Sequence, residues 1–256
     1  MDLQLKGKTA VVTGGSRGIG RAIAECFADE GANVAICARN AEQVAETVKA
    51  LEGRGVRAWG QAVDIADGLA LKAFITQAGV ELGGVDILVS NASALVQGNA
   101  ETDWQAMFEI DILGAVRTFE AAKPLLLASA AAKGDAVFLM ISSVSAAQSD
   151  TPSSYGAMKS ALIHFAKGIA RENAPKGLRC NVISPGTVFF EGGAWGNVKA
   201  NNPGFFEMMI KRNPTGRMAT PEEVAAASVF LASPRSAFTT GINMLVDGAI
   251  SSRVNF

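Results

Sequence analysis

Short apolar runs alternate with amphipathic stretches along the chain, and this alternation restricts its fold more than any other feature. The apolar runs have the length of buried strands and lie at residues 9–13, 33–37, 56–63, 85–90, 136–141, 178–184 and 243–246. Helical patterns between them are long enough to join parallel strands. The sequence therefore predicts an α/β fold in which a parallel sheet is covered by helices on both faces.

The composition is typical of one domain that binds a small molecule. Of 256 residues, 49% are hydrophobic and 18% charged, so the chain can bury a large core. No linker interrupts it, and we expect a single domain over residues 1–256. The net charge of −1 provides no electrostatic footprint for nucleic acid or an anionic membrane surface.

Cysteine and histidine are too scarce to build covalent or metal sites. Cys26, Cys37 and Cys180 share no ligand spacing, and His164 is the only histidine, so we expect neither a disulfide framework nor a metal. The first residues lack the apolar core of a signal peptide, and no apolar run approaches the roughly 20 residues that cross a bilayer. A cytoplasmic protein without membrane attachment is expected.

A glycine-rich turn separates the first apolar run from the helical pattern at 18–29. Residues 13–20 read Thr-Gly-Gly-Ser-Arg-Gly-Ile-Gly. Glycines allow a tight turn and the close approach of a pyrophosphate, whose charge then meets the free amides of a helix N-terminus. The turn is either purely structural or part of a dinucleotide site, and its place between a strand and a helix favours the second interpretation.

The end of the second apolar run indicates which dinucleotide is bound. An NAD site is expected to have an acidic residue there for the ribose hydroxyls, whereas this chain has Ala38 and Arg39. Arg39 and Arg17 could meet a 2′-phosphate through charge-assisted hydrogen bonds, so NADP(H) is the predicted cofactor. The alternative is that both arginines are solvated surface residues.

Three further polar residues occupy informative positions. Asp64 either accepts from the adenine amino group or caps the helix that starts near Asp67. Asn91, just past the fourth apolar run, is expected to tie neighbouring strand ends together through its amide. Asp111 lies among apolar residues in a helical pattern at 102–133, which Pro124 is expected to kink or divide. A carboxylate in such surroundings is either paired or functional.

The chemistry-bearing stretch runs from the fifth apolar run into the next helix. Ser142 and Ser143 follow the strand, at the sheet edge where ligands bind in this architecture. Tyr155, the only tyrosine, precedes Lys159 by one helical turn. A free phenol titrates near pH ~10, but a neighbouring ammonium favours the phenolate, so such a pair can exchange a proton with a substrate oxygen. The alternative is that the tyrosine ring packs partly on the core while the lysine side chain is exposed to solvent.

Two segments around this stretch have their own predicted structures. Thr151 and Pro152 predict the start of the helix that carries Tyr155. Residues 189–214 are predicted to be irregular and rich in aromatic side chains. Such a long loop is more often functional than a spacer, so we expect a lid at about 187–215 with apolar walls for a substrate pocket.

Six motifs, in their order and spacing, resemble the classical short-chain dehydrogenase/reductase family. They read Thr-Gly-Gly-Ser-Arg-Gly-Ile-Gly at 13–20, Ser-Asn-Ala at 90–92, Ile-Ser-Ser at 141–143, Tyr-Gly-Ala-Met-Lys at 155–159, Pro-Gly at 185–186 and Val-Asp-Gly at 246–248. The resemblance covers almost the whole chain. It implies a single Rossmann-type doubly wound parallel sheet of about seven strands, and hydride transfer between a nicotinamide and a carbonyl or alcohol carbon.

The resemblance also implies roles for individual residues. Tyr155 would be the general acid/base, Lys159 would assist it and hold the nicotinamide ribose, and Ser143 would orient the substrate oxygen. By its distance to Tyr155, Ser142 matches the commoner spacing, so either serine could take this role. Asp111 aligns with a catalytic asparagine of the family. The implied cofactor-binding residues are Gly14, Ser16, Arg17, Gly18, Ile19, Gly20, Arg39, Asp64, Ile65, Asn91, Ala92, Tyr155, Lys159, Pro185, Gly186 and Val188.

Two positions besides Asp111 depart from the family pattern. Ser93 replaces a glycine where the backbone passes close to the cofactor. Phe190 replaces a threonine that often contacts the carboxamide, and it could lend an aromatic wall to the pocket.

The predicted function is NADP(H)-dependent transfer of hydride between nicotinamide and a ketone or secondary alcohol of a fairly apolar small molecule. One alternative is an NAD(H)-dependent alcohol dehydrogenase of the same family. Another is a catalytically silent, cofactor-binding sensor or scaffold. The resemblance further implies a homotetramer or homodimer.

Overall fold

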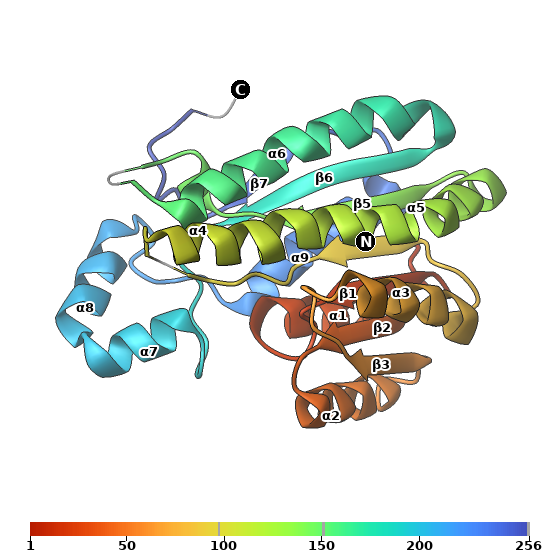
Figure 1. Ribbon diagram of the computed structural model, residues 1–256, viewed down its shortest axis with the longest axis horizontal. Helices are drawn as coiled ribbons and strands as arrows, with labels where there is room; N and C mark the ends of the chain where they lie inside the picture. Colours follow the sequence, from red (N-terminus) through yellow and green to blue (C-terminus); the bar gives the residue numbers. More distant parts are fainter. Residues whose placement is uncertain (97, 150–151, 255–256) are drawn as a thin grey trace.

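The computed structural model describes residues 1–96, 98–149 and 152–254, which are built around a seven-stranded sheet in the order β3-β2-β1-β4-β5-β6-β7 (Figure 1). All its strand pairs are parallel. The strands are β1 (Thr9–Thr13), β2 (Asn33–Ala38), β3 (Ala58–Ala62), β4 (Ile87–Ser90), β5 (Ala136–Ile141), β6 (Leu178–Pro185) and β7 (Asn243–Val246). The predicted doubly wound parallel sheet is confirmed, and its order reverses between β1 and β4, where ligands bind in this architecture.

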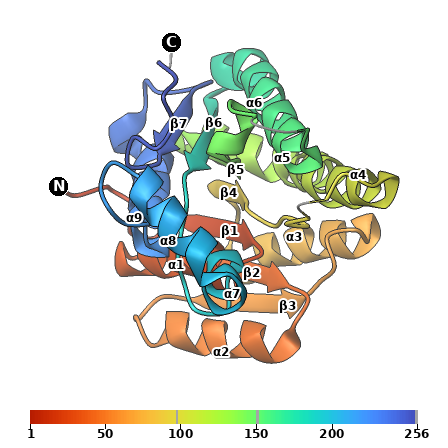
Figure 2. The same ribbon diagram turned by 90° about the vertical axis from the view of Figure 1, so that its left-hand side faces the viewer.

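Helices cover both faces of the sheet (Figure 2). One layer contains α1 (Gly18–Asp29), α2 (Ala41–Glu52) and α9 (Pro221–Ala232), and the other contains α3 (Gly68–Leu82), α5 (Gly114–Lys133) and α6 (Ser154–Asn173). Each layer buries its own apolar cluster against the sheet, around Phe27 on one face and Phe138 on the other. Central strands buried on both faces explain the continuous apolar runs of the sequence. Within the described residues, no helix has the length and apolarity needed to cross a membrane.

Asp67, and not Asp64, caps α3. Oδ1 of Asp67 accepts hydrogen bonds from the amides of Leu69 and Ala70, both at 3.0 Å. Asp64 accepts instead from the amide of Ala66 at 3.0 Å, within the turn that precedes the helix. The interpretation of Asp64 as a helix cap is therefore wrong.

The long helix is interrupted at Asp111, and not at Pro124 as predicted. It consists of α4 (Glu101–Met107), a π-helical turn (Phe108–Leu113) and α5, which continues through Pro124. Proline removes the hydrogen bond to the carbonyl four residues earlier, but Pro124 is exposed, so water can reach that carbonyl. The π-turn changes the rotation between successive side chains, and Asp111 within it is buried.

Helix α6 begins later than predicted. Its first residue is Ser154, and the side chain of Ser153 caps it by accepting from the Gly156 amide at 3.1 Å. Pro152 precedes the helix, so a first-turn proline is wrong here, and Thr151 lies outside the described residues. Ser153 takes the capping role because its hydroxyl can accept from an amide three residues later.

The segment predicted to be irregular contains two helices, α7 (Ala194–Asn201) and α8 (Pro203–Arg212). They lie together at one end of the molecule, on the left of Figure 1 and nearest the viewer in Figure 2. Trp195 stacks on Phe205 between them, with ring centroids 6.0 Å apart. Helices this short are marginal in isolation and depend on such packing, which explains why periodicity alone did not reveal them.

Asp86 joins the start of β4 to β1 and α5 through a buried carboxylate. It accepts from the Thr9 amide at 2.8 Å and from Nζ of Lys133 at 2.7 Å, and Oγ of Ser129 also donates to it. Burial opposes ionisation of Asp86, but the hydrogen bonds from Lys133, Ser129 and Thr9 outweigh it, so the pKa of Asp86 is lowered.

We expect Asp86→Asn to lower the free energy of unfolding by about 2 kcal/mol at neutral pH, because the charge-assisted contact with Lys133 is lost. A carboxylate with a lowered pKa stabilises the folded state above its unfolded pKa, and that contribution disappears as the pH falls through the folded value, which lies below the ordinary 3.8. Urea unfolding of both proteins should show a difference that shrinks only in acid. A pH-independent difference would contradict this account.

Candidate active site

A cavity of about 1030 Å³ opens at the carboxyl ends of the strands, beside helices α7 and α8. Its wall contains every residue predicted to bind the cofactor, from Gly14 to Val188, together with Ser142 and Ser143. Asp111 is the one predicted site residue outside the wall, because it lies behind Lys159. The structure therefore brings residues from five of the six motifs, all but the Val-Asp-Gly motif at 246–248, together at one sheet edge.

The glycine-rich turn forms a part of the wall where side chains do not fit. Gly14 and Gly18 have positive φ values of 66° and 54°. A Cβ on Gly20 would lie 2.2 Å from the Gly14 carbonyl oxygen and 2.4 Å from Nδ2 of Asn91. Helix α1 begins at Gly18, and the side chain of its N-cap residue, Arg17, makes no capping hydrogen bond to the first amides. This backbone fits the pyrophosphate of a dinucleotide.

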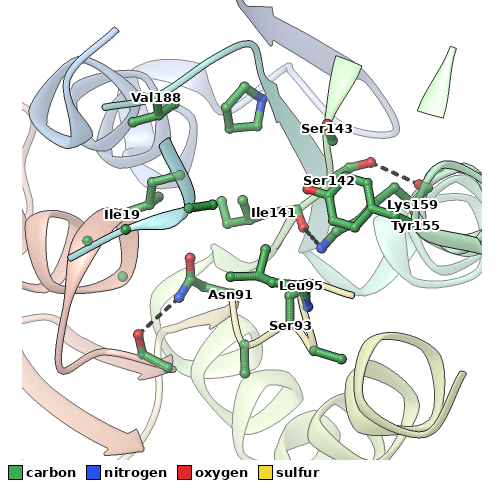
Figure 3. A pocket seen from close by; sticks show the side chains of 18 of the residues that line it. Ile19, Asn91, Ser93, Leu95, Ile141, Ser142, Ser143, Tyr155, Lys159 and Val188 are labelled. Atoms are coloured by element: carbon green, nitrogen blue, oxygen red, sulfur yellow. Dashed lines mark hydrogen bonds between the residues drawn. The ribbon is translucent and has the colours of Figure 1, made fainter. Parts of the chain in front are cut away.

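Asn91 ties β4 to β1, as predicted. Its Nδ2 donates to the carbonyl oxygens of Thr13 and Gly14, both at 3.1 Å, and its amide donates to Oγ1 of Thr13 at 3.1 Å. Figure 3 shows the Asn91 side chain in the cavity wall. These bonds hold the glycine-rich turn against the end of the neighbouring strand. The predicted structural role of Asn91 is confirmed.

Two exposed arginines extend the wall beyond the turn. Arg39 follows β2, and in the described part of the chain no hydrogen bond or ion pair holds its side chain. Arg17 has Nη1 3.5 Å from the Gly192 carbonyl oxygen. Asp64 is the sole acidic residue among the described residues of the wall. The cationic region at the end of β2 fits a 2′-phosphate.

Tyr155 and Lys159 lie together on another part of the wall, on the first turns of α6 (Figure 3). Nζ of Lys159 is 5.6 Å from the Tyr155 ring centroid and donates to the Ile141 carbonyl oxygen at 3.0 Å. Lys159 is only 3% exposed, so the interpretation that places this lysine in water is wrong. The Tyr155 hydroxyl has no hydrogen-bond partner among the described residues, which leaves it open to a ligand.

Asp111 forms a buried ion pair with Lys159. Its Oδ1 lies 2.9 Å from Nζ, and the two side chains are 0% and 3% exposed. The contact has the distance of an ion pair but not the angles of a hydrogen bond. Oδ2 of Asp111 accepts from the Ala94 amide at 2.9 Å, in the loop after β4. Asp111 is thus paired, which was one of its two predicted states.

The neighbouring serines differ in the use of their protons. Oγ of Ser142 donates to the Lys159 carbonyl oxygen at 2.9 Å. Oγ of Ser143 accepts from the Ser145 amide at 3.1 Å. Because a hydroxyl has a single proton, the proton of Ser142 is occupied within the protein, whereas that of Ser143 is available to a ligand.

Phe190 forms an aromatic part of the wall, as predicted. It lines the cavity together with Trp195 and Met209. Its ring packs on the glycine-rich turn so closely that a Cβ on Gly18 would lie 2.4 Å from a ring carbon. The segment at 187–215 therefore contacts the turn directly and adds apolar surface to the cavity.

Two polar residues of the wall were not identified from the sequence. Nε2 of Gln148 and Oγ1 of Thr187 are buried, and within the described residues neither has a hydrogen-bond partner. Thr187 follows the Pro-Gly motif, and Gln148 lies between Ser143 and Tyr155. The only sign of these residues in the sequence was their position next to recognised motifs. Their burial could not be predicted, because the burial of a polar atom depends on contacts that the sequence does not reveal.

Thiol and metal chemistry find little support in the structure. Burial raises the pKa of Cys37 to about 12 and that of Cys26 to about 11, and it also raises the pKa of Cys180. Protonated thiols are poor nucleophiles. Over residues 1–96, 98–149 and 152–254, no three His, Cys, Asp or Glu side chains group as metal ligands would.

Known proteins match this chain over nearly its whole length. The sequence profile of the family described as enoyl-(acyl carrier protein) reductase matches residues 14–251. Isoepoxydon dehydrogenase patN of Penicillium expansum is 36% identical, covering 98% of each chain. L-Sorbose reductase from Gluconobacter frateurii, solved with NADPH and L-sorbose, has a TM-score of 0.90 and 32% identity over 99% of this chain and 100% of that one. The Pseudomonas aeruginosa RhlG complex with NADP has a TM-score of 0.89 and 31% identity over 97% and 98%.

Proposed function

The chain belongs to the short-chain dehydrogenase/reductase family of oxidoreductases, and we propose that it transfers hydride between NADP(H) and a ketone or secondary alcohol. One observation carries the proposal: Ser143, Tyr155 and Lys159 share a cavity with a glycine-rich turn that fits a pyrophosphate. A dinucleotide on the turn and a carbonyl compound beside Tyr155 would therefore meet in the same cavity.

Tyr155 is assigned the proton transfer. Its free hydroxyl would protonate the carbonyl oxygen during reduction, or accept the alcohol proton through the reverse step. Ser143 would donate its available proton in a hydrogen bond to the same oxygen and so orient it. The Lys159 ammonium, held by Asp111 and the Ile141 carbonyl, would stabilise negative charge on these oxygens.

The cofactor is assigned to the glycine-rich turn and the cationic region beside it. Bound NADP(H) would supply or accept the hydride. Residues 14–20 would hold the pyrophosphate, and Arg39 and Arg17 would hold the 2′-phosphate. The adenine and nicotinamide ends are assigned to Asp64, Ile65, Asn91, Ala92, Pro185, Gly186 and Val188, all of which line the cavity. The NADPH and NADP in the sorbose reductase and RhlG structures support this choice of cofactor.

The segment at about 187–215 is assigned as the substrate lid of a single domain. Phe190, Trp195 and Met209 contribute apolar surface from this segment to the cavity. That surface supports a fairly apolar substrate, since apolar contacts gain from the removal of water.

A cofactor-binding sensor without catalysis is a second candidate, and Asp111 is the observation that favours it. The carboxylate compensates the Lys159 charge that would otherwise act fully on Tyr155. The hydroxyl protons of Tyr155 and Ser143, which no described residue accepts, favour an enzyme over a sensor. Absorbance of NADPH over a panel of ketones, and of NADP over a panel of secondary alcohols, tests the proposal. Turnover above the rate without protein supports an enzyme, and cofactor binding without any turnover would leave the sensor.

Arg39→Asp should shift the preference from NADP(H) toward NAD(H). The substitution removes a cation from the proposed 2′-phosphate site and adds a carboxylate that suits the ribose hydroxyls. We expect the ratio of kcat/KM for NADPH to that for NADH to fall about tenfold or more. Arg171→Asp, an exposed change outside the cavity wall, is the matched control. An unchanged ratio in the Arg39 variant would refute the role of this residue.

A further inference from the structure

Gln148 is a polar group in the cavity wall that the proposed chemistry does not use. It lies in the segment that joins β5 to α6, between Ser143 and Tyr155. Its Nε2 is buried, and no described residue accepts a hydrogen bond from it. Buried amide groups in folded proteins nearly always have a partner, because an unpaired one is costly. An acceptor among the contents of the cavity would satisfy this amide.

Ser145 and Ala146, in this segment, lie against the helix that carries Tyr155. Oγ of Ser160 donates to the Ala146 carbonyl oxygen. Gly156, the residue after Tyr155, lies so close to the segment that a Cβ on it would be 2.8 Å from the Ser145 carbonyl oxygen. These contacts hold the residues just before Gln148 against the first turns of α6, and Gln148 and Tyr155 line the same cavity.

We propose that Gln148 binds a second oxygen of the substrate, so that the substrate class is a ketone or secondary alcohol with another oxygen acceptor near the reacting carbon. The inference rests on the proposed function and narrows it. The amide nitrogen only donates, so the atom that it binds must be an acceptor. Leu95, Trp195 and Met209 line the same cavity, so apolar groups suit the remainder of the substrate.

Ketones that differ by one atom test this inference. Methoxyacetone and 2-pentanone differ by an ether oxygen in place of a methylene, and so do 4-methoxy-2-butanone and 2-hexanone. The ratio of kcat/KM within each pair is measured by NADPH oxidation for the unaltered enzyme and for Gln148→Met, which keeps the chain length and removes the donor. The ether ketones also differ from the plain ketones in intrinsic reactivity. This difference is the same for both proteins, so it cancels when their kcat/KM ratios are compared.

We expect the oxygenated-to-plain ratio to fall about tenfold or more in Gln148→Met for at least one pair, because a site built to bond an oxygen rejects the analogue without it. Gln148→Leu provides a second apolar variant if the first does not fold, and Gln61→Met, at an exposed position outside the wall, is the matched control. Equal ratios in all proteins, with turnover intact, would overturn this inference alone. No turnover of any ketone would overturn the proposed function itself.

Discussion

Tyr155→Phe is expected to lower kcat/KM for ketone reduction by about 10²- to 10⁴-fold, the range for loss of a positioned acid or base. The substitution removes one oxygen atom and leaves the ring in place. The Tyr155 hydroxyl bonds no described residue, so its removal leaves no partner within the described protein unpaired. The loss should therefore fall on turnover and not on stability. The measurement is NADPH oxidation with the best ketone of the panel.

Binding of NADPH provides the control for the Tyr155 variant. The glycine-rich turn and Arg39 are untouched, so the dissociation constant, measured by nicotinamide fluorescence, should change little. Thermal unfolding should also be nearly unchanged. An active Tyr155→Phe enzyme would refute the assignment of Tyr155 as the acid, even though the fold and the family would stand.

Asp111→Ala is expected to destabilise the folded protein by about 3–5 kcal/mol, because it leaves the buried Lys159 ammonium without its counter-charge. The Ala94 amide, which bonds Oδ2 of Asp111, also loses its acceptor. The measurement is the free energy of unfolding in urea at fixed protein concentration. Turnover should fall as well, since the loop after β4 and the Lys159 side chain both lose a contact that positions them.

Two further variants distinguish the effect of losing the Asp111–Lys159 ion pair from a general loss of stability. Lys159→Met in the Asp111→Ala background removes the stranded charge, so the double variant should be more stable than Asp111→Ala alone. Glu172→Ala breaks an exposed pair with Lys123 and should change stability little. If Asp111→Ala were as stable as the unaltered protein, the ion pair would not be the reason for a carboxylate at this position.

Local patterns predicted most of the framework. Five-residue β1 and six-residue β5 begin and end where the apolar runs do, because a strand buried on both faces must be apolar throughout. The start of α9 at Pro221 has a local signal of the same kind, because Oε2 of Glu223 accepts a hydrogen bond from the Thr220 amide three residues earlier, at 2.9 Å. Signals of this kind lie within a few residues of one another and need no knowledge of the fold.

The errors at Pro124 and in residues 189–214 share a cause, because a local pattern does not show which surroundings the fold provides. Pro124 has a strong local tendency to break a helix, but its exposed position lets water reach the carbonyl that loses its hydrogen bond. Helices α7 and α8 are too short to be stable alone and form where Trp195 can stack on Phe205. Both outcomes depend on surroundings that are assembled from other parts of the chain.

By itself, the sequence determined the order of strands and helices, the glycine-rich turn and the spacing of Tyr155 and Lys159, because periodicity and backbone preferences are properties of neighbouring residues. Only the tertiary structure decided that Asp111 compensates Lys159, that Ser143 and not Ser142 keeps its proton free, and that the Gln148 amide is buried in the cavity wall. The physical reason is that charge compensation, proton availability and desolvation are set by groups that folding brings together from distant parts of the chain.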